Sequence, residues 1–218
     1  MEKEITKKRI EIKVAEELTE LVELDIFENK EKFVIKINKN SKNLVPLKEV
    51  PAGTVVKVGE IECIVLGKTN EGKFLITKKT TAHMKFGNVK NNYELSDVRS
   101  YCNGNFYKLL SFMAGKENIV PHNVFLETED GYKNNPRFIS DKVSIITTRY
   151  YRRFREHIQP SKYPWWTATP VTKSSLSSDI CYIESNGIID KTDISCNLGV
   201  RPFFCLKSSL KVEIVNNN

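Results

Sequence analysis

The 218-residue chain has 40% hydrophobic and 28% charged residues, a balance typical of a globular protein with one full core. It contains no apolar run of about 18 residues, so the sequence predicts no membrane-spanning helix and no membrane insertion. The net charge is +7. Such a surface either attracts nucleic acid, membrane surfaces or acidic polymers, or only keeps the protein soluble.

The N-terminal segment, MEKEITKKRIEIK, mixes acids with bases and lacks an apolar core, which argues against a secretory signal peptide. We therefore expect the protein to be made in the cytoplasm. The five cysteines are odd in number, show no CxxC spacing, and are interpreted as buried free thiols. The three histidines lie far apart, so the sequence predicts no metal site and no cofactor.

Residues 1–43 are predicted to form a small β-α-β appendage. Residues 9–14 alternate polar and apolar side chains as a strand does, 15–30 carry a helical stripe, and 32–37 alternate again. The polar segment NKNSKN at 38–43 then marks a linker to the main domain at 44–218. Two interpretations stay open: the appendage attaches the protein or forms a homo-oligomer, or it is a simple packed extension.

The main domain is expected to begin with three short antiparallel strands at 54–58, 61–66 and 73–77. Ser96 is a favourable N-cap for a helix, which Gly104 interrupts and Gly115 ends. After the interruption, the predicted buried stripe comprises Phe106, Leu109, Leu110 and Met113. Residues 118–126 are predicted to be extended.

A second helix is expected after a short strand at 142–146, capped by Thr147 or Thr148 and reaching Ile158. Its apolar stripe consists of Tyr150, Tyr151, Phe154 and Ile158. Four arginines surround this stripe: Arg149, Arg152, Arg153 and Arg155. They form either a patch that binds nucleic acid or a solvated basic face.

The next stretch opens with two adjacent tryptophans, Trp165 and Trp166, which must point to opposite faces if the segment is a strand. An exposed tryptophan beside hydroxyl side chains would suit recognition of a sugar or peptide, whereas two buried tryptophans would serve the core. The candidate ligand-binding residues, here and in loops 167–178 and 190–198, are Trp165, Trp166, Thr167, Thr169, Lys173, Ser174 and Asn197.

The C-terminal strands are predicted at 180–184 and 200–206, with a turn at 185–187. Gly187 in this turn and Gly199 before the last strand are interpreted as structural. Arg201 lies among apolar residues, so we expect it to pair with a buried carboxylate or with loop carbonyls.

The pattern WWTATP…SSDICYIESNG…NLGVRPFFCL resembles a family of unknown function found in bacteria and prophages, with the pattern WWLRSPG…GVRPAL. LSDVRSYCNGNFYKLL at 95–110 and DKVSIITTRYYRRF at 141–154 are similar to further segments of that family. The family looks like a divergent relative of the C-type lectin-like fold. The resemblance therefore implies an α+β domain with a twisted antiparallel sheet, two main helices and long loops.

This resemblance implies no reaction, because the fold carries many functions. Ala168 and Val171 replace the family's arginine and glycine after the tryptophans, and the calcium motifs of sugar-binding lectins are absent. The leading hypothesis is a non-enzymatic binding or virion-associated structural module that contacts a protein or a cell-surface glycan or polymer.

The virion location applies if the gene belongs to a prophage. Two alternatives are a nucleic-acid-associated accessory protein and an enzyme of the formylglycine-generating type, which uses a cysteine pair comparable to Cys196 and Cys205.

Overall fold

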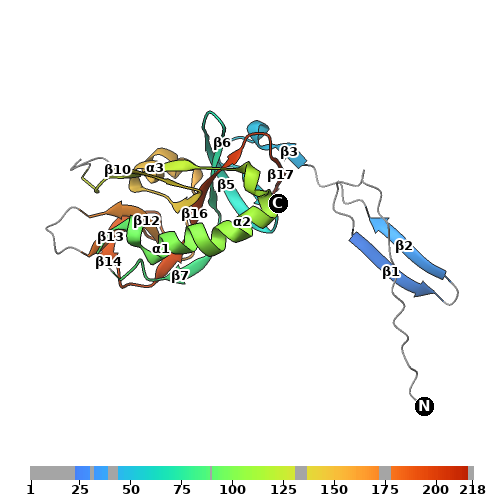
Figure 1. Ribbon diagram of the computed structural model, residues 1–218, viewed down its shortest axis with the longest axis horizontal. Helices are drawn as coiled ribbons and strands as arrows, with labels where there is room; N and C mark the ends of the chain where they lie inside the picture. The colour runs from blue at the N-terminus through green and yellow to red at the C-terminus, as the bar shows by residue number, and fades with distance from the viewer. Residues whose placement is uncertain are drawn as a thin grey trace, which may run out of the picture. The chain divides into compact units, whose positions relative to one another are not determined.

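The structure is a computed structural model that describes residues 23–29, 32–38, 44–88, 90–130, 137–171 and 178–215 (Figure 1). The chain divides into two compact units, Met1–Lys42 and Asn43–Asn218. Within the described ranges, no helix has the length and apolar character needed to cross a membrane.

The N-terminal unit contains an antiparallel pair of strands, β1 (Glu23–Asn29) and β2 (Lys32–Asn38). The strand predicted at 32–37 is confirmed, whereas the helix predicted over 15–30 is wrong for the part that forms β1. Apolar and acidic residues alternate in ELDI at the start of β1, and this period of two suits a strand once β2 supplies a partner. The strand predicted at 9–14 and residues 15–22 lie outside the described residues.

The larger sheet of the main domain has eight strands, and all of its pairs are antiparallel. Its order is β11-β16-β6-β5-β4-β17-β3, with β8 on β16. The strands are β3 (Leu44–Pro46), β4 (Val55–Val58), β5 (Ile61–Lys68), β6 (Gly72–Thr77), β8 (Ile119–Val120), β11 (Val143–Ile145), β16 (Pro202–Lys207) and β17 (Lys211–Ile214). The three strands predicted between 54 and 77 are confirmed as β4, β5 and β6.

A second sheet of five strands has the order β14-β13-β12-β15-β7. Its strands are β7 (Ala82–Met84), β12 (Trp165–Pro170), β13 (Asp179–Ile183), β14 (Ile189–Asp193) and β15 (Leu198–Val200). β12 and β15 run parallel, and the other pairs are antiparallel. A separate hairpin joins β9 (His122–Leu126) to β10 (Arg137–Asp141).

One long helical segment runs from α1 (Asp97–Tyr101) through a π-helical turn, η3 (Cys102–Phe106), into α2 (Tyr107–Ala114). Ser96 caps it by accepting a hydrogen bond from Arg99 N at 3.0 Å. The π turn changes the helical phase, so that Phe106, Leu110 and Ala114 are buried. Leu109, predicted to be buried, is instead 46% exposed.

The second helix, α3 (Thr148–Phe154), is capped by Thr147, which accepts from Tyr150 N at 3.3 Å. Tyr151 and Phe154 are buried as predicted, whereas Tyr150 is only half-buried. Short 3-10 turns complete the chain: η1 (Leu47–Glu49), η2 (Tyr93–Leu95), η4 (Lys116–Asn118) and η5 (Arg155–His157). Mostly antiparallel strands with two helices confirm the predicted α+β class.

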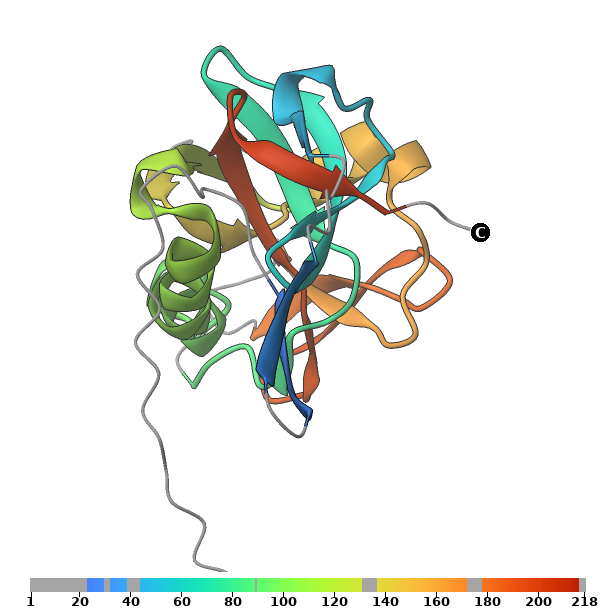
Figure 2. The same cartoon turned by 90° about the vertical axis from the view of Figure 1, so that its right-hand side faces the viewer.

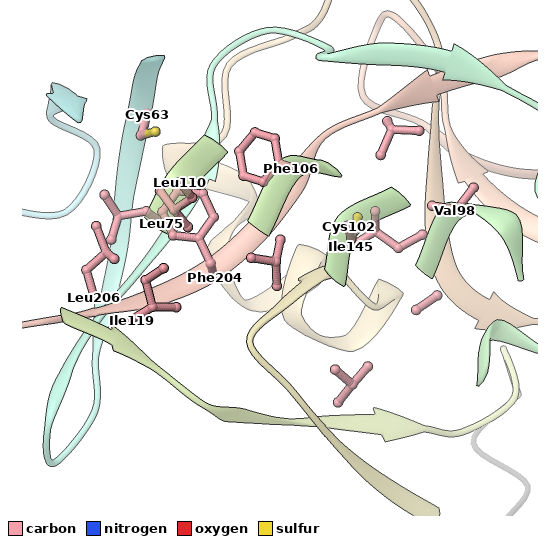
Figure 3. Close-up of a cluster of buried hydrophobic side chains, with 14 of the residues drawn as sticks. Cys63, Leu75, Val98, Cys102, Phe106, Leu110, Ile119, Ile145, Phe204 and Leu206 are labelled. Carbon is pink, nitrogen blue, oxygen red and sulfur yellow. The ribbon is translucent and has the colours of Figure 1, made fainter. Parts of the chain in front are cut away.

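The central strands of the larger sheet are buried on both faces. Figure 2 shows α1–α2 (green) and α3 (gold) on opposite sides of these strands. On the α1–α2 side, Leu75 and Phe204 pack against Leu110 (Figure 3), while the next residues along β6 and β16 belong to a second cluster with α3. The core therefore consists of two layers, one on each face of the same sheet. The loops of the domain project from this packed core.

Candidate functional site

The structure brings together the two loops that the sequence nominated for ligand binding. Ile194 N donates to Ser178 O at 3.2 Å, and the Ser178 hydroxyl donates to the Asp193 carboxylate. We call the surface formed by 171, 178–179 and 193–197 the loop face. Asn197 is exposed on it, whereas Lys173 and Ser174 lie outside the described residues.

Asn91 forms hydrogen bonds to both ends of the first loop, at Val171 and Asp179. Its side-chain amide donates to Val171 O at 3.3 Å and to Asp179 O at 2.8 Å. Val171 N also donates to Asp179 O at 3.2 Å, so the two ends of the loop are bonded directly and through Asn91. The two described ends of the loop thus form a closed base.

Asp193 gives the loop face a fixed negative charge. Hydrogen bonds from the Ser178 hydroxyl and from the side chain and backbone of Ser195 lower the pKa of Asp193 to about 2. The distance from Ser195 N to Asp193 Oδ1 is 2.8 Å. The carboxylate is therefore ionised at neutral pH and accepts bonds from both loops.

Four of the candidate ligand-binding residues are buried in β12. Trp165 and Trp166 are 1% and 0% exposed, because β12 is a central strand covered on both faces. Trp166 Nε1 donates to Met84 O at 2.9 Å. The hydroxyl of Thr167 donates to Cys181 O at 2.6 Å, and that of Thr169 accepts from Thr148 N at 2.9 Å. These side chains pack beneath the loop face and are closed to a ligand. Of the two alternatives that the sequence left open, the structure shows two buried tryptophans.

Arg201 is fully buried and bonded to carbonyl groups. Its Nε donates to Thr77 O at 2.9 Å, one terminal nitrogen donates to Gln159 O at 3.4 Å, and its guanidinium lies 4.8 Å from the centre of the Trp165 ring. Burial lowers the pKa of Arg201 to about 10, although Tyr151 acts in the opposite direction. Arg201 thus has two backbone carbonyls, one at the end of β6 and one in a loop, and an aromatic ring as partners, which is closer to the expected pairing with loop carbonyls than to pairing with a carboxylate.

The two glycines interpreted as structural are constrained in different ways. Gly187 has φ +87°, a left-handed conformation that favours glycine, and its carbonyl accepts from the Tyr151 hydroxyl at 2.8 Å. A Cβ on Gly199 would lie 2.3 Å from the methyl group of Thr80. Gly199 therefore fixes backbone geometry two residues after the loop face, whereas Gly187 fixes the turn at the other end of the β13–β14 hairpin.

Sequence reasoning missed an ion pair that joins two distant segments. Arg99 binds Asp141 through two nitrogens, with Nε 3.1 Å from each carboxylate oxygen and a terminal nitrogen 2.7 Å from Oδ1. Asn103, in the π turn, accepts from Lys142 N and Val143 N at 3.2 and 3.3 Å. The segments 95–110 and 141–154, which carried the family resemblance, are thus bonded to each other.

The four arginines of the predicted basic patch are all exposed. Arg149 pairs with Glu127 at 3.5 Å. Arg153 lies 5.3 Å from the centre of the Phe154 ring, so its guanidinium packs on the aromatic residue beside it. The other two arginines, like Arg153, form no salt bridge within the described part of the chain.

A buried histidine–serine pair was also missed, because its members are 22 residues apart. His122 Nε2 lies 2.8 Å from Ser144 Oγ, and the two residues are 6% and 0% exposed. Burial lowers the pKa of His122 to about 4. The imidazole is neutral, but the pair is enclosed by Phe74 and Phe203 and presents no surface to a substrate.

The cysteines are free thiols, and four of the five are buried, as predicted. Cys205 belongs to the cluster on the α3 side, whereas Cys196 packs against the cluster on the α1–α2 side. Burial raises the pKa of Cys205, which keeps its thiol protonated. The structure does not bring these two cysteines together as a reactive pair.

A cavity of about 400 Å³ lies beside the β4–β5 hairpin. Polar and charged side chains supply most of its lining, which consists of Lys57, Glu60, Ile61, Glu62, Thr77, Lys79, Thr80 and Thr81. None of the residues nominated from the sequence lines this cavity.

Residues 126–208 match a protein-family model described as Domain of unknown function (DUF6273). The matched range contains the tryptophan pair, the 141–154 segment and Arg201, and it fits the expected resemblance to a family of unknown function. No curated protein and no solved structure matches the chain.

Proposed function

We propose that residues 44–218 form a non-enzymatic binding module of the C-type lectin-like class, whose loop face contacts a protein or a cell-surface glycan or polymer. The observation that carries this proposal is the bonding between the two loops through Ser178, Asp193 and Ile194. A surface assembled in advance from two loops loses less conformational freedom on binding than separate mobile loops would.

The buried residues of the domain support the proposal that binding belongs to the loops and stability to the interior. Arg99, Asp141, Trp166 and Arg201 all make intramolecular contacts, so their side chains stabilise the domain. Loops on such a scaffold are where binding residues usually lie. The C-type lectin-like assignment itself rests on the sequence resemblance and is compatible with the α+β architecture.

The loops are better suited to contact a partner than the neighbouring edge strand, β14. Asp190 accepts from Lys191 N at 2.8 Å, and Asp193 O accepts from Cys196 N at 3.0 Å. These bonds occupy backbone groups that an added strand would need. Partner recognition by strand addition at β14 is therefore disfavoured relative to recognition by side chains of the loops.

Residues 1–43 would attach the module or join copies of it, and a virion location follows if the gene lies in a prophage. A formylglycine-generating type of enzyme is the weaker proposal, because Cys196 and Cys205 lie in different clusters and Cys205 is protonated.

The proposal is tested by applying the full chain to a glycan array and to a panel of purified surface proteins. Replacing 172–177 with a Gly-Ser linker, or making Asn197→Ala, is expected to weaken binding at least about tenfold. Asn105→Ala, an exposed asparagine on the α1–α2 segment, is the matched control. Unchanged binding by folded loop variants, or no binding to any member of either panel, would refute the proposal.

A further inference from the structure

A second exposed surface is formed by α3 and the β9–β10 hairpin, with residues different from those of the loop face. Phe138 is 60% exposed, and its ring lies 4.8 Å from that of buried Phe125. The guanidinium of Arg149 lies 5.1 Å from the centre of the same Phe125 ring. Phe138 and Arg149 therefore both lie beside the Phe125 ring, and Figure 1 shows β10 and α3 at the same end of the main domain.

The arginines extend this surface along the helix. Arg152 and Arg153 follow Arg149 by three and four positions, which places them next to it on one side of α3. Arg152 and Arg153 are exposed and form no salt bridge within the described ranges. They are therefore available to an external anion.

The acidic residues nearby do not cancel this charge. Glu127 has a side chain only 14% exposed and already pairs with Arg149. Glu129 is half-buried and accepts from the Cys181 thiol at 3.6 Å. Glu156 is exposed, with its carboxylate 3.5 Å from His157 Nε2. Between residues 148 and 157, the exposed charged side chains are thus four arginines and Glu156.

We propose that this arginine–phenylalanine surface binds single-stranded nucleic acid. Phe138 would stack on a base, and Arg152 and Arg153 would contact phosphates through their planar guanidinium groups. A duplex hides the faces of its bases, so it would leave Phe138 without a partner. A polyanion without bases would use the arginines alone. The inference does not depend on the loop face.

The test is fluorescence anisotropy with the full chain and labelled oligo(dT) of about 12 nucleotides at low salt. Phe138→Ala is expected to weaken binding by about fivefold to a hundredfold, the usual effect of losing one stacking residue. Combined Arg152→Ala and Arg153→Ala substitutions are expected to weaken binding and to reduce the salt slope by about 1.4.

Phe112→Ala is the matched control, because Phe112 is 89% exposed but lies on α2. It should leave affinity unchanged, and thermal unfolding of each variant verifies that the fold is intact. A duplex of equal length and inorganic polyphosphate are the competitors. The proposal is overturned if oligo(dT) does not bind or if the duplex binds with equal affinity. It is also overturned if Phe112→Ala weakens binding as much as Phe138→Ala does, or if polyphosphate displaces the oligonucleotide and Phe138→Ala has no effect on affinity.

Discussion

Acid is expected to destabilise the main domain through His122, which the fold holds in its neutral form. One ring nitrogen of His122 bonds to Ser144, while Nδ1 has no partner within the described residues. Phe74 and Phe203 contact the ring edge-on. Protonation would place a charge in this apolar site, so burial lowers the pKa of His122 despite the opposing effect of Asp141.

The size and direction of the effect follow from this pKa. His122 titrates at about 4 in the folded state, compared with its ordinary value of 6.5. The unfolded state binds more protons between these values, so the free energy of unfolding is at its full value above pH 6.5 and falls as the pH drops through the folded pKa. At about 1.4 kcal/mol per pH unit, the full loss is about 3 kcal/mol.

Urea unfolding between about pH 4 and pH 7 measures this loss when the wild type is compared with a His122→Phe and Ser144→Ala double variant. Replacing both partners removes the titrating group without leaving the serine unbonded. The difference in unfolding free energy between the two proteins should change by about 3 kcal/mol over the range. His83→Phe, at an exposed histidine, should retain the wild-type slope. Parallel stability curves for the wild type and the double variant would refute this account of His122.

Three further substitutions test the contacts described above. Asp141→Ala should lower the unfolding free energy by about 2 kcal/mol in urea titrations, because partly exposed Arg99 loses its charged partner. Asn91→Ala should cost about 1–2 kcal/mol and accelerate amide exchange at Val171 N, since the loop base loses two hydrogen bonds. Gly199→Ala should cost about 1–3 kcal/mol in thermal unfolding through its clash with the Thr80 methyl group, and Thr80→Ser should restore part of the loss.

Local patterns predicted the elements whose partners are close in sequence. β4, β5 and β6 follow one another through short turns, so alternation and turn residues were sufficient to find them. β1 was missed because its residues also fit a helical stripe, and pairing with β2 decides between the two. The exposure of Leu109 depends on a π turn for which the sequence carries no periodic signal.

In the candidate site, too, local features were predictable from the sequence and long-range contacts were not. Polar composition identified the loops, but their bonding through Ser178 and Asp193 spans 15 residues and depends on the sheet register. The orientation of the tryptophans was predictable only as opposite faces. Trp165 packs against Tyr151 and Trp166 against Phe86, so the burial of both depends on a layer on each side of β12.

The segments that carry the family resemblance contact one another, which indicates that their shared pattern specifies the fold. Segment 95–110 reaches segment 141–154 through Arg99 and Asp141, and the tryptophan segment reaches Arg201 through the Trp165 ring. Residues that hold distant segments together in this way specify a fold, because their polar groups are already bonded within the domain. Under the two proposals made above, binding specificity would come from exposed residues that do not hold the framework together, such as Asn197 and Phe138. Proteins that share the pattern are therefore expected to share this architecture and to differ in what they bind.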